Sequence, residues 1–225
     1  GAQVKDIEIR ETKGVCSHMS LKHAWEMMKD SGVVTLPIVN AKNKLEGLIV
    51  TGDIATSYMD VYDNRVLATA RTQYRNIVET MDGELLTGNE HGYFVKGKVV
   101  VASGDDEVMK EYIEEVDLVI LANRPESQRC ALELNASCIV VCTGTEVSEE
   151  ILAMAKERDC VVIRTPFDSF TAARLINQSM PIKYFMKKDN LVTFELEDYV
   201  DDVKEEMAKV RHRDFPVLDE NGNYV

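Results

Sequence analysis

The sequence contains no long apolar run, and this absence excludes an ordinary membrane-spanning helix. Its longest uninterrupted apolar stretches, such as residues 118–122 and 139–142, are far shorter than the roughly 20 residues that such a helix needs. No basic segment followed by an apolar stretch opens the chain, so nothing indicates export and we expect a cytoplasmic protein. A hydrophobic share of 45% in 225 residues nevertheless suits one large or two ordinary buried cores.

Positive charge is also scarce. The chain has 26 Lys and Arg against 39 Asp and Glu, a formal net charge of -13. Such a chain repels the phosphate backbone of DNA or RNA, so we do not expect nucleic acid as a partner. Many of the cations crowd into one C-terminal stretch, which either binds a small polyanion or is a solvated helix face balancing nearby carboxylates. These cations are Lys183, Lys187, Lys188, Lys204, Lys209, Arg211 and Arg213.

Constellations that mark metal sites and catalytic centres are missing as well. Cysteines number five, an odd count, and three lie in or beside apolar runs, so we expect reduced thiols that pack as small hydrophobes. Cys138 and Cys142 would lie about 13 Å apart in an extended strand, too far to share one ion, and we expect no metal. Because no nucleophile and base pair is evident and the four histidines lack ligand spacing, we also expect no catalytic residue.

An internal repeat is present instead. Pro37 and Pro216 lie 179 positions apart, and a gap-free shift by that number aligns three identities and four conservative pairs. The aligned pairs are Glu26 with Glu205, Met28 with Met207, Leu36 with Phe215, Pro37 with Pro216, Ile38 with Val217, Val39 with Leu218 and Asn40 with Asp219. Each copy predicts a short strand (14–16; 191–194), an amphipathic helix (20–29; 198–210) and a strand at the proline. The first copy adds a strand at 45–50 and a helix near Asp53, whereas we expect the second to be truncated at Val225.

Two segments carry a family resemblance. Leu36-Pro-Ile-Val-Asn, followed by a turn and by Gly47-Leu-Ile-Val-Thr-Gly-Asp53-Ile, resembles a CBS motif, and Phe215-Pro-Val-Leu-Asp219 resembles a second one. CBS motifs work in pairs, and in many members the clefts of a pair hold adenosine nucleotides. The resemblance therefore implies that the two ends of this chain fold together and bind an adenine nucleotide.

The resemblance also implies which residues contact that nucleotide. Asp53 would accept both ribose hydroxyls and Thr51 would offer its hydroxyl to a phosphate oxygen, although the family usually has Ser or Thr where Val50 stands. Alternatively, Asp53 simply caps the following helix by bonding its first free amides. Arg211 and Arg213 would bind phosphate through charge-assisted hydrogen bonds. The full expected site is Val34, Thr35, Leu36, Pro37, Thr51, Asp53, Tyr184, Thr193, Arg211, Arg213, Asp214, Phe215 and Pro216.

Within this site the adenine is expected against the backbone just before the proline of each copy. Pro37 and Pro216 hold the chain extended there. Tyr184, with its neighbour Phe185, can stack on a base, or the two rings can be core residues.

Between the copies, apolar strands alternate with helices, which predicts a parallel α/β domain. The expected strands are 99–102, 118–122, 139–142 and 161–164, and the expected helices are 105–115, 126–134, 148–158 and 168–178. Asp105 or Asp106 and Ser148 are expected N-caps. A linker helix is expected over 68–81, with an apolar stripe that packs on this domain or on a second subunit.

Three segments of this middle region resemble a DRTGG domain: Asn123-Arg124, Thr143-Gly144-Thr145 and Thr165-Pro-Phe-Asp168-Ser-Phe-Thr-Ala-Ala-Arg174-Leu-Ile. Asn replaces the family's Asp, and Thr145 replaces its second Gly. Residues 143–145 either cradle an anion on free amides or form an ordinary turn, since the lysine and spacing of a P-loop are lacking.

The predicted fold is thus mixed α/β and α+β: two βαββα-like CBS motifs (1–64 and 180–225) form one module around an inserted linker helix and DRTGG-like domain (65–179). This order resembles the regulatory insert of CBS-containing family II inorganic pyrophosphatases. The resemblance implies a homodimeric regulatory fragment, inhibition by AMP and ADP, activation by ATP and diadenosine polyphosphates, and a parent enzyme using Mn, Co or Mg in catalytic domains absent here. Alternatives are an enzyme handling phosphates or acyl phosphates through residues 143–145, Asp168 or Arg174, and a dimerisation scaffold with an empty cleft.

Overall fold

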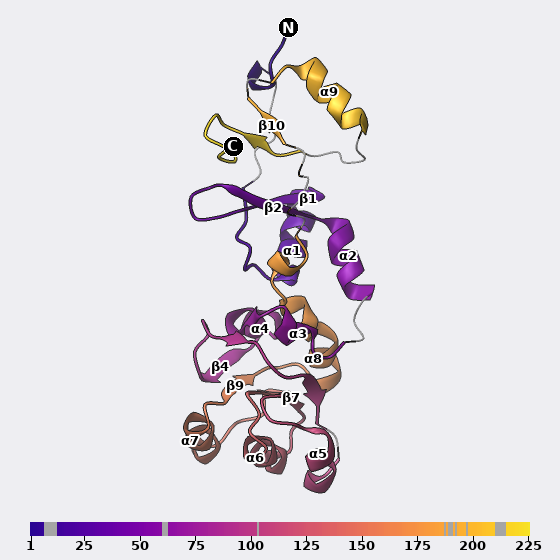
Figure 1. Cartoon of the computed structure of the whole chain (residues 1–225). Helices are drawn as coiled ribbons and strands as arrows, with labels where there is room; N and C mark the ends of the chain where they lie inside the picture. Colours follow the sequence, from indigo (N-terminus) through magenta and orange to yellow (C-terminus); the bar gives the residue numbers. More distant parts are fainter. Residues whose placement is uncertain are drawn as a thin grey trace. The chain divides into compact units, whose positions relative to one another are not determined.

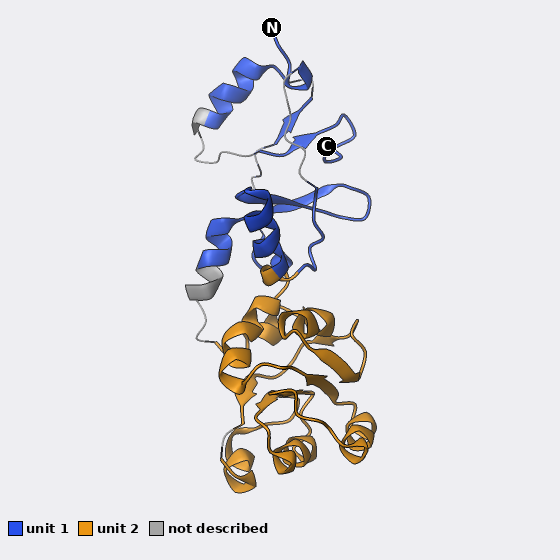
Figure 2. Cartoon of the chain, turned by 180° about the vertical axis from the view of Figure 1, so that it is seen from behind, with its two compact units in different colours: residues 1–19, 23–59, 182–225 blue, residues 20–22, 60–181 orange. Residues whose placement is uncertain are grey.

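The chain divides into two compact units, coloured separately in Figure 2. The computed structural model describes residues 1–6, 13–59, 63–102, 104–186, 188, 191, 193–196, 198–209 and 215–225. Unit 1 comprises residues 1–19, 23–59 and 182–225, and unit 2 comprises residues 20–22 and 60–181. Unit 1 therefore joins the two ends of the sequence in one body, as the repeat predicted.

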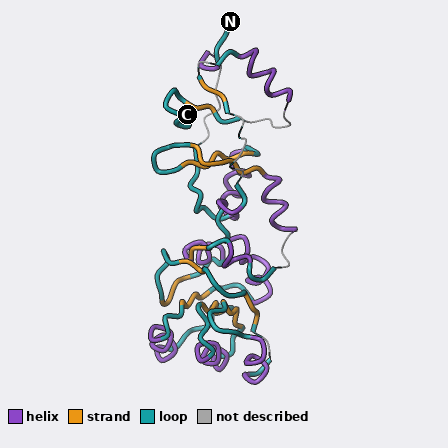
Figure 3. Tube along the Cα trace, viewed as in Figure 1, coloured by secondary structure: helices purple, strands orange, loops and turns teal. Residues whose placement is uncertain are grey.

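Unit 1 holds both copies of the repeat, and its elements can be followed along the tube in Figure 3. The first copy forms α1 (Leu21–Ser31, whose first two residues group with unit 2), β1 (Thr35–Val39), β2 (Leu45–Val50) and α2 (Thr51–Met59). The second copy forms β10 (Phe194–Glu195), α9 (Val200–Lys209) and β11 (Val217–Leu218). Short 3₁₀ helices precede the copies: η1 (Val4–Asp6) and η3 (Ile182–Tyr184). The predicted strand over 14–16 is reduced to one bridge at Val15, and the predicted end of α9 at Val210 lies outside the described residues.

The two copies share their backbone hydrogen bonds at the same offset of 179 residues. Val15 donates its amide to Pro37 O over 2.9 Å, and Phe194 donates to Pro216 O over 2.9 Å. In both copies a short extended segment thus pairs in parallel with a strand at the proline, which lies inside β1 and directly before β11. The repeat seen in the sequence is therefore a repeat of backbone geometry.

The hairpin turns that follow these strands are also equivalent. In each turn the first side chain accepts hydrogen bonds from the amides two and four residues later: Asn40 Oδ1 at 2.9 and 3.0 Å, and Asp219 Oδ1 at 2.9 and 2.9 Å. Asn43 and its equivalent Gly222 both have positive φ, 60° and 78°, a conformation that Asn and Gly tolerate best. An Asx turn therefore closes both hairpins.

The segments leading into the copies are exchanged between them. Val4 in η1 donates its amide to Asp198 O of the second copy over 2.6 Å. Ile182 in η3 donates to Met19 O of the first copy over 2.8 Å. Because Met19 and Asp198 are themselves 179 positions apart, each lead-in segment completes the copy that it does not precede.

Further contacts join the turn of the first copy to the end of the second. Tyr224 donates its amide to Asn43 O over 2.9 Å, and Asn43 Nδ2 donates to Tyr224 O over 2.6 Å. Lys44 also donates from Nζ to the Asn221 carbonyl. At Gly14 an added Cβ would lie 2.8 Å from a Val39 γ-carbon and 3.4 Å from the Tyr224 ring, so only glycine permits this close approach.

Unit 2 is built around a five-stranded sheet. The strands of unit 2, inside and outside this sheet, are β3 (Thr72–Gln73), β4 (Glu84–Thr87), β5 (Tyr93–Phe94), β6 (Val99–Val101), β7 (Leu118–Leu121), β8 (Cys138–Val141) and β9 (Val161–Arg164). Its helices are α3 (Val66–Thr69), α4 (Tyr74–Thr80), α5 (Asp106–Tyr112), α6 (Pro125–Glu133), α7 (Glu149–Glu157) and α8 (Ser169–Leu175), followed by the 3₁₀ helix η2 (Ile176–Ser179). The sheet order is β4-β9-β8-β7-β6, with β3 and β5 paired separately.

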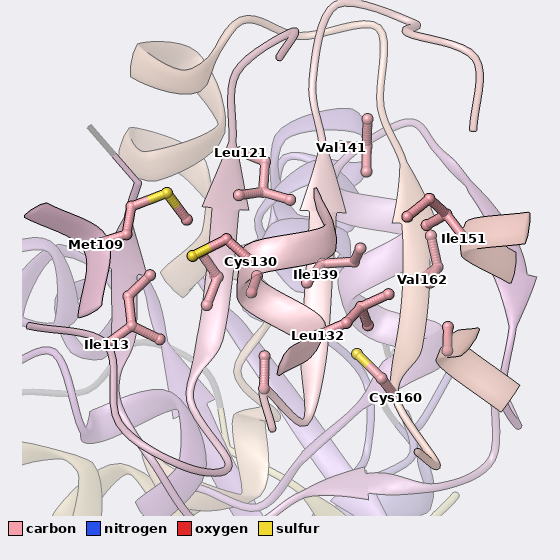
Figure 4. Close-up of a cluster of buried hydrophobic side chains, with 14 residues drawn as sticks. Met109, Ile113, Leu121, Cys130, Leu132, Ile139, Val141, Ile151, Cys160 and Val162 are labelled. Atoms are coloured by element: carbon pink, nitrogen blue, oxygen red, sulfur yellow. The ribbon is translucent and has the colours of Figure 1, made fainter. Parts of the chain in front are cut away.

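Helices cover both faces of this sheet. Helices α5, α6 and α7 lie along one face and α3, α4 and α8 along the other (Figure 1). The first face is closed by a cluster of buried apolar side chains that includes Met109 of α5, Leu132 of α6 and Ile139 of β8 (Figure 4). Burial on both faces explains why the strands read as continuous apolar runs rather than as alternating ones.

Four strands of the sheet are parallel, as predicted, but the fifth was not foreseen. Strand β4 pairs antiparallel with β9, with a register shift between Leu85 and Thr87. At this register shift the Thr87 hydroxyl bonds to the backbone of the neighbouring strand segment: Oγ1 donates to Cys160 O over 2.8 Å and accepts from the Val162 amide over 3.0 Å. The sheet is therefore mixed, with one antiparallel edge strand.

The predicted linker helix over 68–81 is wrong. The chain forms α3, the short strand β3 and α4 there, because it turns at Arg71, which has φ 55°. Thr72 Oγ1 secures that turn by donating to Leu67 O over 2.8 Å. The apolar stripe that suggested one helix is real, since Ile77 and Met81 are fully buried, and it packs inside unit 2.

Helix starts in unit 2 follow the predicted caps. Asp105 accepts the Val108 amide at 3.1 Å, and Ser148 accepts the Ile151 amide at 3.2 Å. Pro125 opens α6, where its missing donor costs nothing. Among the helices of the described residues, none is long and apolar enough to cross a membrane.

Candidate nucleotide site

The predicted site residues of the first copy come together where β2 becomes α2. Thr51, the first residue of α2, donates its amide to Val34 O over 3.0 Å. Next to this bond Thr35 lies opposite Val50 in the β1–β2 ladder. The segment before Pro37 and the segment containing Thr51 and Asp53 are therefore adjacent.

Asp53 is held in place by the strand that precedes its helix. Its Oδ2 accepts the Val50 amide at 2.9 Å, the contact by which an acid at the third helical position satisfies the N-cap amide. The predicted capping role needs a correction. Asp53 is the third residue of α2, and it accepts the amide of a residue before the helix, Val50, rather than the first free amides that follow it. Asp53 is partly exposed, and within the described residues Oδ1 accepts no hydrogen bond, so this oxygen is available to a ligand.

Among the residues that the structure describes, no backbone group pairs with Thr35 on the side away from β2. In an antiparallel ladder, hydrogen-bonded and non-bonded pairs alternate, and since Thr51 bonds Val34, the Thr35–Val50 pair is a non-bonded one. The amide and carbonyl of Thr35 therefore point away from β2, as does Pro37 O, which accepts the Val15 amide. Pro37 fits in mid-strand because its missing donor would also point away from β2. The amide and carbonyl of Leu36, by contrast, point toward β2, and the residue is only 1% exposed.

The predicted residues of the second copy are placed only in part. Phe215 packs edge-on against Phe194, with ring centroids 5.2 Å apart, and Pro216 is buried. Arg211, Arg213 and Asp214 lie outside the described residues. The structure therefore places the residues that were predicted to contact adenine and ribose in the first copy, whereas those predicted to contact phosphate are not placed; all of these contacts stay predictions.

A cavity of about 600 Å³ lies between β10 and α9. It is lined by Leu191, Thr193, Phe194, Asp198, Tyr199, Asp202, Val203 and Glu206. Three of these side chains are carboxylates and none is a cation, so the wall repels a polyphosphate. Thr193, which was predicted to contact nucleotide, lies here rather than beside Asp53.

Tyr184 is 48% exposed and packs edge-on against Phe185, with ring centroids 5.0 Å apart. The alternative that Tyr184 is a core residue is therefore wrong. Its exposed ring is open to stacking.

Residues 143–145 of unit 2 form an ordinary turn and not an anion cradle. Thr143 donates its amide to Phe167 O at 2.8 Å, Gly144 to Thr165 O at 2.9 Å, and Thr145 to Cys142 O at 3.3 Å. An anion would find none of these three amides free. The alternative enzyme reading thus loses its proposed phosphate-binding element.

The carboxylate of that alternative, Asp168, is already engaged, and two buried cysteines nearby are inert. Asp168 caps α8 by accepting the Thr171 amide at 2.7 Å, and this hydrogen bond lowers the pKa of its carboxyl. Burial raises the pKa of the Cys142 thiol to about 11 and that of Cys160 to about 12, so both are protonated at neutral pH. The described residues contain no cluster of His, Cys, Asp and Glu that could hold a metal.

Comparison with known families matches both parts of this architecture. The CBS domain model matches residues 4–60 and 182–225, and the DRTGG domain model matches residues 76–179. The fold and the matches together define a pair of CBS motifs with an inserted DRTGG domain.

Individual relatives identify the family more closely. A solved structure of the CBS and DRTGG domains of the regulatory region of Clostridium perfringens pyrophosphatase, complexed with the activator diadenosine tetraphosphate, is 40% identical with a TM-score of 0.94 and covers 100% of this chain and 98% of that one. The chain belongs to this family of CBS–DRTGG regulatory regions.

Full-length relatives are much longer than the chain. The cobalt-dependent inorganic pyrophosphatase of Clostridium perfringens (strain 13 / Type A) is 40% identical over 223 residues, which are 99% of this chain and 41% of that protein. A probable manganese-dependent inorganic pyrophosphatase of Thermotoga maritima is 29% identical over 219 residues, 97% of this chain and 40% of that protein. The chain thus spans about two fifths of the pyrophosphatases that it matches.

Proposed function

We propose that the chain is a regulatory module that binds adenine nucleotides beside Thr35 and Asp53 and thereby controls a family II inorganic pyrophosphatase. One observation carries the proposal: the relative with a TM-score of 0.94 holds diadenosine tetraphosphate as its activator. We propose regulation rather than catalysis by the chain itself.

The geometry of the first copy suits an adenosine. An amide and a carbonyl of one residue, Thr35, form a donor and acceptor pair at a strand edge, which matches the acceptor and donor on the Watson–Crick edge of adenine. The free Oδ1 of Asp53 suits the ribose hydroxyls, and the Thr51 hydroxyl suits the nearest phosphate oxygen. Arg211 and Arg213 supply the charge for the remaining phosphates.

The regulatory consequences follow from the expected ligands. We propose that AMP and ADP inhibit and that ATP and diadenosine polyphosphates activate, because the two kinds of ligand favour different arrangements of the paired motifs. A ligand shifts such an equilibrium only by its difference in affinity for the two arrangements.

The assembled state is also proposed. We propose a cytoplasmic homodimer in which a diadenosine ligand spans two chains across a symmetry axis, joined to catalytic domains that use Co, Mn or Mg. Gel filtration tests the dimer, and a monomer both with and without nucleotide contradicts it.

Titration calorimetry with AMP, ATP and a diadenosine polyphosphate tests the central proposal. We expect saturable binding and, for Arg213→Ala, AMP affinity weakened about tenfold or more, since one charge-assisted hydrogen bond contributes roughly 1.5 to 3 kcal/mol. No heat and no thermal shift with any nucleotide would instead favour the empty scaffold. Turnover of pyrophosphate or acyl phosphates by the purified chain would favour the enzyme alternative.

A further inference from the structure

One buried side-chain amide of unit 2 has no hydrogen-bond partner. Gln128, the fourth residue of α6, is only 1% exposed, and its Nε2 is buried without a partner among the described residues. Buried polar side chains are paired in the large majority of cases, and an unpaired one destabilises the fold. Gln128 therefore calls for a partner that the domain itself does not supply.

This amide lies beneath the amino end of α6. Side chains on a helix lean toward its N-terminus, and residues four apart lie on one face. Gln128 therefore lies one turn below Arg124, which directly precedes the helix and is exposed. The same end of α6 follows β7 at the carboxyl edge of the parallel strands, and open α/β sheets bind their ligands outside that edge.

The amino end of α6 also lacks a cap. Arg124 stands at the N-cap position without a capping hydrogen bond, and Pro125 follows it. Among the described residues the Glu126 amide has no acceptor, and the Glu126 carboxylate accepts no hydrogen bond that would cap the helix. The positive end of the helix dipole is therefore left without a neutralising side chain. Helices that follow the neighbouring strands are capped, by Asp105 in α5, Ser148 in α7 and Asp168 in α8.

Arg124 supplies positive charge at this end of the helix. Its Nη1 donates to Gly104 O over 2.6 Å, which holds the side chain near the edge of the sheet. The other guanidinium nitrogens bond no described residue, and Arg124 forms no ion pair with one. A guanidinium held through one nitrogen keeps donors for the oxygens of a phosphate.

The other unpaired buried oxygen near this edge, Asp106 Oδ1, lies on the opposite side of α6. The Asp106 carbonyl contacts Cys130 Sγ over 3.9 Å, and Cys130 follows Gln128 by two residues, or about 200° around the helix. Arg129, between them in sequence, pairs instead with Glu150 of α7. The Asp106 carboxylate therefore does not share the side of the helix on which Gln128 lies.

We propose that the amino end of α6 binds a phosphate group through the Arg124 guanidinium, the Glu126 amide and the Gln128 side chain. Such a ligand gives Gln128 the acceptor that it lacks, bonds the charged Arg124 and lies at the positive end of the helix dipole. This site belongs to unit 2 alone and differs from the turn at residues 143–145, whose amides are already bonded. The DRTGG domain thus has a ligand of its own, independent of the nucleotide site.

NMR spectroscopy of the whole ¹⁵N-labelled chain, titrated with inorganic phosphate, tests this site. We expect saturable shifts at the Glu126 amide and at the Gln128 side-chain amide. The Ile151 amide, which Ser148 caps at 3.2 Å, should not shift. No shift at Glu126, or equal shifts with chloride at the same ionic strength, overturns the proposal.

Two substitutions and a matched control separate the site from general attraction by charge. Arg124→Ala should weaken phosphate binding about tenfold or more, because a charge-assisted hydrogen bond is lost. Arg129→Ala removes the same charge from an exposed position of the same helix and should leave binding nearly unchanged. Equal weakening by the two variants overturns the site.

The second substitution, Gln128→Leu, should weaken phosphate binding about two- to tenfold without lowering Tm, since the buried amide has no protein partner to lose. Phosphate binding as tight as in the unaltered chain overturns the role of Gln128. A lowered Tm shows that the amide is paired inside the domain, and this result also contradicts the proposal.

Discussion

Replacing Asp53 by Asn separates ligand recognition from helix stability. In the structure Oδ2 bonds the Val50 amide at 2.9 Å while Oδ1 bonds no described residue. Asn keeps one carbonyl oxygen for the Val50 amide and loses the charge that would hold the ribose hydroxyls. Because a hydrogen bond to a charged group contributes roughly 1.5 to 3 kcal/mol, we expect AMP to bind about 10- to 150-fold more weakly.

The free energy of unfolding should respond differently. Asp53→Asn should lower it by less than about 1 kcal/mol because the contact that starts the helix is kept. Asp53→Ala removes both roles and should lower it by about 0.5 to 2 kcal/mol, the range for a lost helix cap. Titration calorimetry and thermal unfolding of the three proteins measure the two quantities. If Asp53→Asn binds AMP as tightly as the unaltered chain, Asp53 only stabilises the helix and our assignment of the ribose is refuted.

Three further predictions concern packing, thiols and pH. Gly14→Ala should lower the free energy of unfolding by about 1 to 3 kcal/mol, because the added Cβ would lie 2.8 Å from a γ-carbon of Val39 in β1. Gly52→Ala in α2 is the control: its Cβ would lie 3.9 Å from the nearest atom, so the change should be neutral or stabilise by up to about 1 kcal/mol. Equal effects of the two substitutions in thermal unfolding would contradict the close packing at Gly14. A thiol reagent should modify Cys16 alone in the folded chain, since the other four cysteines are buried, and a second fast equivalent would argue against this burial. Hydrogen bonds, first among them that from the Asn223 amide, lower the pKa of the Asp219 carboxyl from 3.8. The stability that the ionised Asp219 contributes should therefore be complete above about pH 4 and be lost as the pH falls through the lowered pKa. An Asp219→Asn chain that loses as much stability over this pH range as the unaltered chain would refute this role of Asp219.

The fold was predictable where pattern and period agree. The repeat at 179 residues located the paired strands and helices of unit 1, since an offset that preserves proline, strand and turn also preserves backbone hydrogen bonds such as Val15 to Pro37. Continuous apolar runs located the four parallel strands of unit 2, because strands covered on both faces have no polar side.

Other features were beyond the sequence for physical reasons. Nothing in the helical spacing of residues 68–81 reveals that Arg71 adopts positive φ, because arginine rarely does so. Strand β4 carries no long apolar run, since an edge strand is covered less completely. The exchange of the lead-in segments depends on backbone donors such as Val4 and Ile182, and backbone donors leave no mark on residue type.

The candidate site was foreseen in part. The proximity of Val34 and Thr35 to Thr51 and Asp53 follows from the β1–β2 hairpin. The bond from the Val50 amide to Asp53 was missed, although an acid at the third position of a helix is its usual signal. That the amides of Thr143 and Gly144 are already hydrogen-bonded could not be foreseen, because both acceptors lie in the loop after β9.

A crystal structure of the chain with AMP tests the central claim most directly. Our account requires the adenine edge on the Thr35 amide and carbonyl, and the ribose hydroxyls on Asp53 Oδ1. AMP bound elsewhere, with Asp53 contacting only the Val50 amide, would contradict it.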